Sequence, residues 1–157
     1  MKQKIKSYAL SVFLALAVGG LSALLTSGGM DFYSKIHKPP LSPPSIAFPI
    51  VWTILFILMG VSAAIIYNSD ALDTEKRMAL TTYAISLIFN LLWSVIFFNF
   101  RWFLFAFFWL LALLYLILRT IIKYYKISPI AAYLQIPYLL WVAFAGYLNF
   151  AIWYINR

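Results

Sequence analysis

Hydrophobic and polar positions alternate along this chain on the scale of whole helices rather than of single residues. Five apolar runs, each long enough to cross a bilayer as a helix, are separated by short segments that carry most of the charges. The pattern predicts helices over about residues 8–27, 43–67, 78–98, 103–122 and 129–155. We therefore expect an all-α fold, an integral membrane bundle of five transmembrane helices that forms one domain over residues 1–157.

The connection between the first two runs, residues 28–42, is the one long loop that the pattern predicts. Its end reads KPPLSPP from Lys38 to Pro44, and consecutive prolines favour a stiff, extended backbone. Ser42 followed by Pro43 suits the N-cap and first turn of the next helix. Gly28 and Gly29 give the loop a flexible root, so we expect it to act as a lid over one end of the bundle.

Composition supports the membrane interpretation and excludes several functions. The 157 residues are 65% hydrophobic and only 10% charged, with a mean hydropathy of +0.92, which is too little polar surface for a soluble domain. The absence of cysteine excludes disulfides, thiolate chemistry and cysteine-ligated metals. The net charge of +8 is spread between the apolar runs, so it indicates contact with anionic lipid headgroups rather than with nucleic acid.

The distribution of basic residues predicts how the bundle crosses the membrane. Lys2, Lys4 and Lys6 precede a run that could be a signal peptide, but the run is long enough to span and no A-x-A site follows, which favours a retained helix. Eight basic residues then fall on the side of the N-terminus and four on the other. We expect a membrane protein with its N-terminus in the cytoplasm and its C-terminus outside.

The most informative stretch lies in the last run, where residues 135–149 read QIPYLLWVAFAGYLN. Tyr138, Trp141, Ala145 and Asn149 recur at spacings of three and four, so they share one face of a helix. An amide in hydrocarbon needs a partner or a ligand. The face is therefore either a packing surface with one satisfied asparagine or one wall of a ligand pocket.

Depth along the helices brings more such groups to one level. At about 1.5 Å per residue, Trp52, Asn90, Trp93 and Asn149 fall roughly 10 Å below the loop end of their helices, and Trp141 roughly 20 Å below it. Three helices thus place indoles and amides beneath the proline-rich loop. No pair of nucleophile and base and no metal site is visible, and the lone His37 is more consistent with a solvated loop residue than with a haem ligand.

These residues resemble the translocator protein family, also called tryptophan-rich sensory proteins or peripheral-type benzodiazepine receptors. The resemblance covers nearly the whole chain and is carried by three segments in order: residues 32–60, NLLWSVIFF at residues 90–98 and PYLLWVAFAGYLN at residues 137–149. Leu41 and Ser42 stand where family members often have an aromatic residue and then asparagine, which leaves the docking of the loop open.

The resemblance is to bacterial members of the family, and it implies a five-helix bundle in the bacterial cell membrane with a ligand pocket under the first loop. Family ligands are porphyrins and haem, sterols in animal members, and synthetic drug-like compounds, and bacterial members are associated with light-dependent breakdown of protoporphyrin IX. Matched by position, the photochemical tryptophans correspond to Trp52 and Trp141. The ligand-binding set implied by the resemblance and by the helix face comprises Tyr33, Pro43, Trp52, Asn90, Trp93, Tyr138, Trp141, Ala145 and Asn149.

Three functions remain open at this stage. The first is a porphyrin-binding or haem-binding membrane protein that needs no further cofactor and degrades its ligand in light. The second is a transporter of tetrapyrroles or other apolar ligands, although no intramembrane acid or inverted repeat favours it. The third is a sensor whose ligand occupancy is read by partners. Membrane lipids are expected contacts, and a homodimer is left open.

Overall fold

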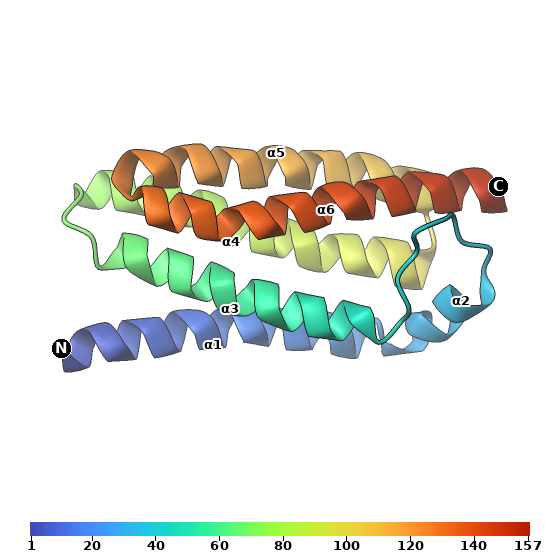
Figure 1. Cartoon of the computed structure of the whole chain (residues 1–157), viewed down its shortest axis with the longest axis horizontal. Coiled ribbons are helices and arrows are strands. Elements are labelled where there is room, and N and C mark those ends of the chain that lie inside the picture. Colours follow the sequence, from blue (N-terminus) through green and yellow to red (C-terminus); the bar gives the residue numbers. More distant parts are fainter.

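The computed structural model describes the backbone of residues 1–157 and all side chains except those at positions 30 and 32. Phe32, which belongs to the loop segment of the resemblance, is thus outside the described side chains. Five long helices lie nearly parallel to one axis (Figure 1). They are α1 (Lys2–Leu25), α3 (Ala47–Tyr67), α4 (Asp73–Ser94, continued by a wider π-helical turn over Val95–Phe100), α5 (Phe103–Ile127) and α6 (Pro129–Asn156).

A short connection sits at one end of the bundle, which we call the loop end. It consists of a 3₁₀ turn (Ser27–Gly29), the short helix α2 (Met30–Lys35) and an extended segment over residues 36–46. The C-terminus lies at the same end and the N-terminus at the opposite end (Figure 1). The helix α2 was not expected, because six residues are too few to show a periodic pattern.

Helix α1 packs on α3 through small side chains. The Ser11 hydroxyl donates to the carbonyl oxygen of Gly60 at 2.7 Å, and Ala15 is fully buried. A Cβ atom on Gly60 would lie 2.5 Å from the Cα atom of Val12, so the backbones meet at this glycine. Ser11 and Ala15 belong to a stripe of small residues at every fourth position, Ser11, Ala15, Gly19, Ala23 and Ser27, a pattern that predicts close packing by another helix. This part of the stripe packs within the protein.

The start of α3 differs from the prediction. The helix begins at Ala47 rather than near Pro43, because the Ser42 hydroxyl donates to the carbonyl of Pro39 within the loop instead of capping a helix. Leu41, just before it, has a φ of 71°, a left-handed conformation that turns the chain after the two prolines. Pro49 lies in the first turn of α3, where its missing N–H has no intrahelical partner to lose.

The glycines at the root of the loop also differ from the prediction. A Cβ atom on Gly29 would lie 2.7 Å from the carbonyl oxygen of Phe98, so this glycine is needed for close packing against the end of α4. Only Gly28 has open space around it. Near its middle the loop is held by α6, because the Asn156 side-chain amide donates to the His37 carbonyl at 2.8 Å and accepts from the His37 N–H at 3.3 Å.

The remaining helices begin earlier or end later than their apolar runs. Helix α4 begins at Asp73, and its first turn carries Asp73 and Glu75, two acids that favour a helix N-terminus. Helix α5 continues to Ile127 through a basic segment. Helix α6 begins at Pro129, and Ser128 caps it by accepting from the Ala131 N–H at 3.4 Å. Hydrophobicity marks the membrane-embedded part of each helix, whereas capping and charge determine the ends.

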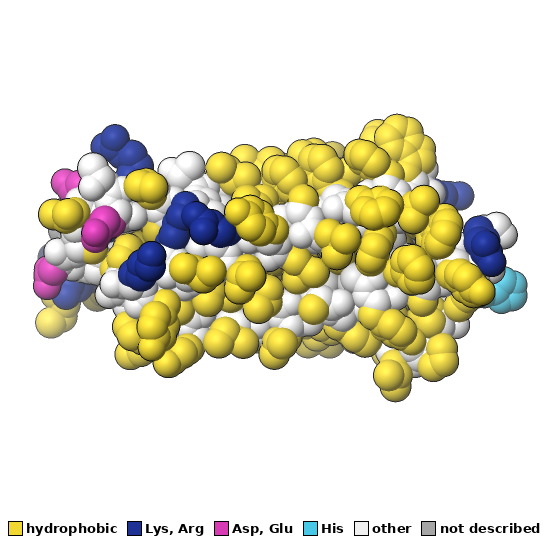
Figure 2. Space-filling model, turned by 90° about the horizontal axis from the view of Figure 1, so that it is seen from above, with side chains coloured by type: hydrophobic (Ala, Val, Ile, Leu, Met, Phe, Trp, Pro, Cys, Tyr) yellow, Lys and Arg dark blue, Asp and Glu magenta, His cyan; other side chains and the backbone are white. Residues whose placement is uncertain are grey.

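The surface confirms an integral membrane protein. Hydrophobic side chains cover the middle of the bundle in the view of Figure 2, and charged side chains gather at its two ends. All five long helices are long and apolar enough to cross a bilayer. The termini lie at opposite ends (Figure 1), as an odd number of spans requires.

Candidate ligand pocket

A cavity of about 380 Å³ lies between α1, α3 and α4 near the loop end. Its volume falls within the roughly 300–1,000 Å³ typical of small-molecule pockets. Three of the predicted site residues, Trp52, Asn90 and Trp93, line it. The other walls come from the small residues of α1 and from the aromatic side chains of Phe48, Phe56 and Phe98.

The aromatic walls are held by ring contacts. Trp52 stacks on Phe56 with ring centroids 5.6 Å apart. On the opposite helix, Trp93 stacks on Phe97 at 5.4 Å and meets Phe98 edge-on at 6.2 Å. Two indoles from α3 and α4 therefore border the cavity in fixed orientations, an arrangement suited to a flat, polarisable ring.

Asn90 supplies the side-chain amide of this pocket, whose lining also includes the hydroxyl residues Ser22, Thr26, Thr53 and Ser94. Its side chain is 3% exposed, and its amide nitrogen has no hydrogen-bond partner among the described residues. The neighbouring Tyr138 hydroxyl lies near Ser86 and Asn90 without a hydrogen bond of regular geometry to either. A buried donor without a partner is costly in hydrocarbon, so Asn90 is the group best placed to bind a ligand oxygen.

Asn149 has a different environment. Its side-chain oxygen accepts from the indole N–H of Trp93 at 3.0 Å, and its amide donates to the carbonyl of Phe103 at 2.7 Å. The residue is 1% exposed and does not line the cavity. Asn149 therefore ties α6 to α4 and α5 and fixes the indole of Trp93. Asn149 makes no hydrogen bond with Asn90.

Trp141, Tyr138 and Tyr33 form a second layer behind the pocket wall. The Trp141 ring meets Trp52 edge-on at 6.4 Å, and Tyr138 meets Trp52 at 6.3 Å. Tyr33 packs edge-on against Phe48 at 5.2 Å, and burial raises the pKa of its hydroxyl while the nearby Ser42 lowers it. Because the two indoles of Trp52 and Trp141 touch, a flat ring could lie between them only if they separated.

Pro43 and Ala145 lie outside the cavity lining. Pro43 belongs to the extended segment before α3, and Ala145 is buried on α6. Among the described residues, no group of three or more His, Asp or Glu side chains could hold a metal ion. The pocket can thus offer stacking, apolar contact, one amide and a few hydroxyl groups.

Comparison with known proteins places the chain in a family. The family model of the TspO/MBR family matches residues 11–154. A tryptophan-rich protein TspO from Chlorobaculum tepidum is 36% identical over 99% of this chain and 99% of its own length. Protein CrtK from Rhodobacter capsulatus is 31% identical over 92% of this chain and 89% of its own length, and the translocator protein of Bos taurus is 34% identical over 88% and 83%.

The chain belongs to the TspO/MBR family. Membership confirms the resemblance drawn from the three segments, including the segment that holds Asn90 and Trp93. It also accords with the five apolar helices: this TspO/MBR protein is an integral membrane protein.

The α1 wall of the TspO/MBR pocket was missed by sequence reasoning. Gly19, Gly20, Ser22, Ala23 and Thr26 all line the cavity. The signal was present, because the stripe of small residues runs through Gly19 and Ala23, but we assigned it to helix packing alone. The stripe does both, since its half toward the N-terminus packs on α3 and its half toward the loop end borders the pocket.

The same wall leaves one side of the pocket open. Gly20, Ala23, Pro49 and Thr53 line the cavity and are also exposed. They belong to α1 and α3, so the cavity opens sideways between these two apolar helices. A ligand larger than the enclosed volume can extend through this opening, and an apolar ligand can reach the pocket from the bilayer.

Proposed function

We propose that this protein binds a tetrapyrrole, of which protoporphyrin IX is the test case, in the pocket between α1, α3 and α4. The observation that carries the proposal is the pairing of two bordering indoles, Trp52 and Trp93, with one buried amide donor that lacks a protein partner, Asn90. A porphyrin is flat and polarisable, so it stacks well on indoles. Its oxygen-bearing substituents would accept the Asn90 N–H.

The basic residue Lys38 at the loop end supports an orientation in which the carboxylates of the ligand face that end. The Lys38 ammonium lies 4.8 Å from the ring centroid of Tyr33 and donates to the Tyr33 carbonyl at 2.9 Å. Tyr33 in turn packs against Phe48, which lines the pocket. A ligand whose carboxylates face the loop end would therefore have a cation close to its charged edge. Haem could use the same surface, with no axial ligand supplied by the described pocket lining.

We further propose that light-dependent degradation of the bound porphyrin, where it occurs, begins with electron transfer from Trp52 to the photoexcited ring. Trp52 lines the cavity. Trp141 packs behind Trp52, with the two ring centroids 6.4 Å apart. Trp141 can then reduce the oxidised Trp52, so both tryptophans take part although only one faces the ligand. The reduced ring passes this electron to molecular oxygen, which becomes superoxide, and the oxidised tryptophan regains an electron from the ring. Superoxide then adds to the oxidised ring, so the ring gains both oxygen atoms and the tryptophans are restored.

A titration of the purified protein in detergent with protoporphyrin IX, in the dark, tests the binding step. Ala23→Phe places a large side chain on the pocket wall, and Ala17→Phe makes the same change on an exposed position of α1 that does not line the cavity. Binding should fall at least about tenfold in the first variant, equivalent to about 1.4 kcal/mol, and stay unchanged in the second. Equal affinities would place the ligand elsewhere.

Illumination of the saturated complexes tests the second step. Trp52→Phe and Trp141→Phe keep most of the apolar area, so dark binding should weaken only within the roughly 0.5–1.5 kcal/mol of an aromatic contact. Loss of porphyrin absorbance in light should slow far more, and most in the double variant. A double variant that degrades porphyrin at the parent rate would show that the tryptophans only line and support the pocket.

A further inference from the structure

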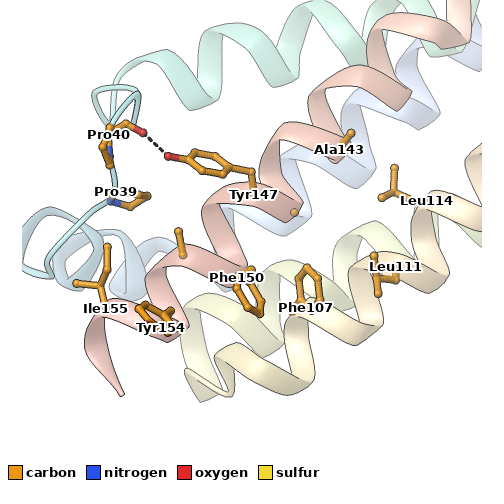
Figure 3. A pocket seen from close by; sticks show the side chains of 12 residues that line it. Pro39, Pro40, Phe107, Leu111, Leu114, Ala143, Tyr147, Phe150, Tyr154 and Ile155 are labelled. Atoms are coloured by element: carbon orange, nitrogen blue, oxygen red, sulfur yellow. Dashed lines mark hydrogen bonds between the residues drawn. The ribbon is translucent and has the colours of Figure 1, made fainter.

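A second and larger hollow lies on the lipid-facing surface between α5 and α6. It is separate from the cavity bordered by Trp52 and Trp93, which we call the tryptophan pocket. It has a volume of about 590 Å³, and almost all of its lining is apolar. Small residues of α6 form its floor and aromatic residues form its walls (Figure 3). We call it the α5–α6 groove and define it by Phe107, Leu111, Ala143, Gly146, Phe150 and Tyr154.

The groove follows from the choice of residues on α6. A Cβ atom on Gly146 would lie 3.1 Å from a methyl carbon of Leu110, so the two helices approach closely at this point. On the outer side of that contact, Ala143 and Ala151 are too small to fill the space between the helices. The rings of Phe107 and Phe150 stand beside it, 5.2 Å apart.

The proline-rich loop forms one side of the groove. Pro39 and Pro40 line it, and the Tyr147 hydroxyl donates to the Pro40 carbonyl at 2.7 Å, which fixes the loop against α6 (Figure 3). The segment of residues 36–46 therefore contacts the groove and leads into the start of α3, where Phe48 and Pro49 line the tryptophan pocket.

The length and the charges of the groove suggest its occupant. From Ala143 to Ile155 the groove extends about 18 Å along α6, close to the roughly 15 Å depth of one leaflet. Its loop-end limit at Tyr154 and Ile155 is followed by Arg157, whose guanidinium lies 4.4 Å from the Tyr154 ring centroid. An apolar channel one leaflet long with a cation at its headgroup end matches one acyl chain and the phosphate of a phospholipid.

We propose that the α5–α6 groove is a specific phospholipid site. One acyl chain lies on the floor of Ala143, Gly146 and Ala151, and the phosphate binds Arg157. The lipid also contacts Pro39 and Pro40, so an occupied groove stabilises the loop that borders the tryptophan pocket. The site does not depend on the tetrapyrrole proposal, because no residue of the groove lines the other cavity.

Native mass spectrometry of the full chain in a mild detergent, titrated with palmitoyl-oleoyl phosphatidylglycerol, tests the site. The parent protein and the control Ala17→Phe should each retain one phospholipid at low lipid concentration. Ala143→Phe combined with Ala151→Phe fills the floor and should weaken retention about tenfold or more. Arg157→Gln leaves the floor intact and should weaken it roughly fivefold, the upper range for a surface ion pair.

Hydrogen exchange provides a second readout, one that lipid adsorbed elsewhere would not change. Exchange at residues 36–46 should slow when the phospholipid is added to the parent protein and stay unchanged in the filled variant. If the filled variant folds poorly, Ala143→Phe alone and Arg157→Gln decide. The proposal is overturned if these variants retain phospholipid as well as Ala17→Phe does. It is also overturned if the parent is a lipid-free dimer that groove filling converts to a monomer, since a second copy then occupies the groove.

Discussion

The hydrogen bond between Trp93 and Asn149 gives the sharpest prediction about what holds the pocket in shape. Asn149→Leu removes the acceptor for the Trp93 indole N–H and the donor to the Phe103 carbonyl, bonds of 3.0 and 2.7 Å. Hydrogen bonds between membrane helices contribute about 0.6 kcal/mol on average and up to about 1.7. Loss of two should therefore lower the free energy of unfolding by about 1–3 kcal/mol.

A double-mutant cycle isolates the bond between the two side chains. Asn149→Leu, Trp93→Phe and the double variant are unfolded by titration with sodium dodecyl sulfate in mixed micelles, and helix content is followed by circular dichroism. The coupling energy between the two positions should lie between about 0.6 and 1.7 kcal/mol. Additive effects would refute the view that Asn149 stabilises the orientation of Trp93.

Asn90 provides the matched control, because it is also a buried asparagine at the same end of the bundle. Its amide nitrogen has no partner among the described residues, so Asn90→Leu removes a polar group that folding left unsatisfied. Such a change is close to neutral or stabilising. Asn90→Leu should keep the parent stability and weaken ligands that carry an oxygen acceptor, whereas Asn149→Leu should affect both.

Three more predictions concern the helices and the loop. Gly60→Ala should destabilise the protein by about 1–3 kcal/mol in the same titration, because the new methyl group meets the α1 backbone, whereas Gly20→Ala, with nothing within 4 Å, should be neutral or slightly stabilising. Leu41→Gly should raise the thermal midpoint in detergent, since a left-handed residue with a Cβ atom costs about 1–2 kcal/mol; a lower midpoint would contradict this. Replacing Pro43 and Pro44 by Ala should speed ligand dissociation in stopped-flow measurements without unfolding the bundle, and an unchanged rate would argue against a lid.

The five spans could be predicted from the sequence because each apolar run is long enough to cross the bilayer by itself, so each can be recognised independently of the others. It was less informative about the helix ends. Ser42 and Pro43 have the residue types of a helix start, yet the Ser42 hydroxyl bonds within the loop and α3 begins at Ala47. Several neighbouring residues can serve as a cap, and tertiary contacts of the loop decide among them.

The sequence predicted only part of the candidate pocket: three of the nine expected site residues line the cavity, and its α1 wall was not expected. Depth along the helices brought Trp52, Asn90 and Trp93 to one level, and the structure places all three around one cavity. The same reasoning treated Asn90 and Asn149 as equivalent, because depth does not show which way a side chain points. Rotation of α6 places Asn149 against Trp93, so its amide is hydrogen-bonded, whereas Asn90 lines the cavity and its amide nitrogen has no partner among the described residues.

An experimental structure of the protein with bound protoporphyrin IX tests the central claim most directly, because it distinguishes the two cavities. We predict that the ring stacks on Trp52 or Trp93 between α1, α3 and α4, with an oxygen-bearing substituent within hydrogen-bond distance of the Asn90 amide. A porphyrin found in the α5–α6 groove, or one that leaves Asn90 without a partner and touches neither indole, would contradict the account.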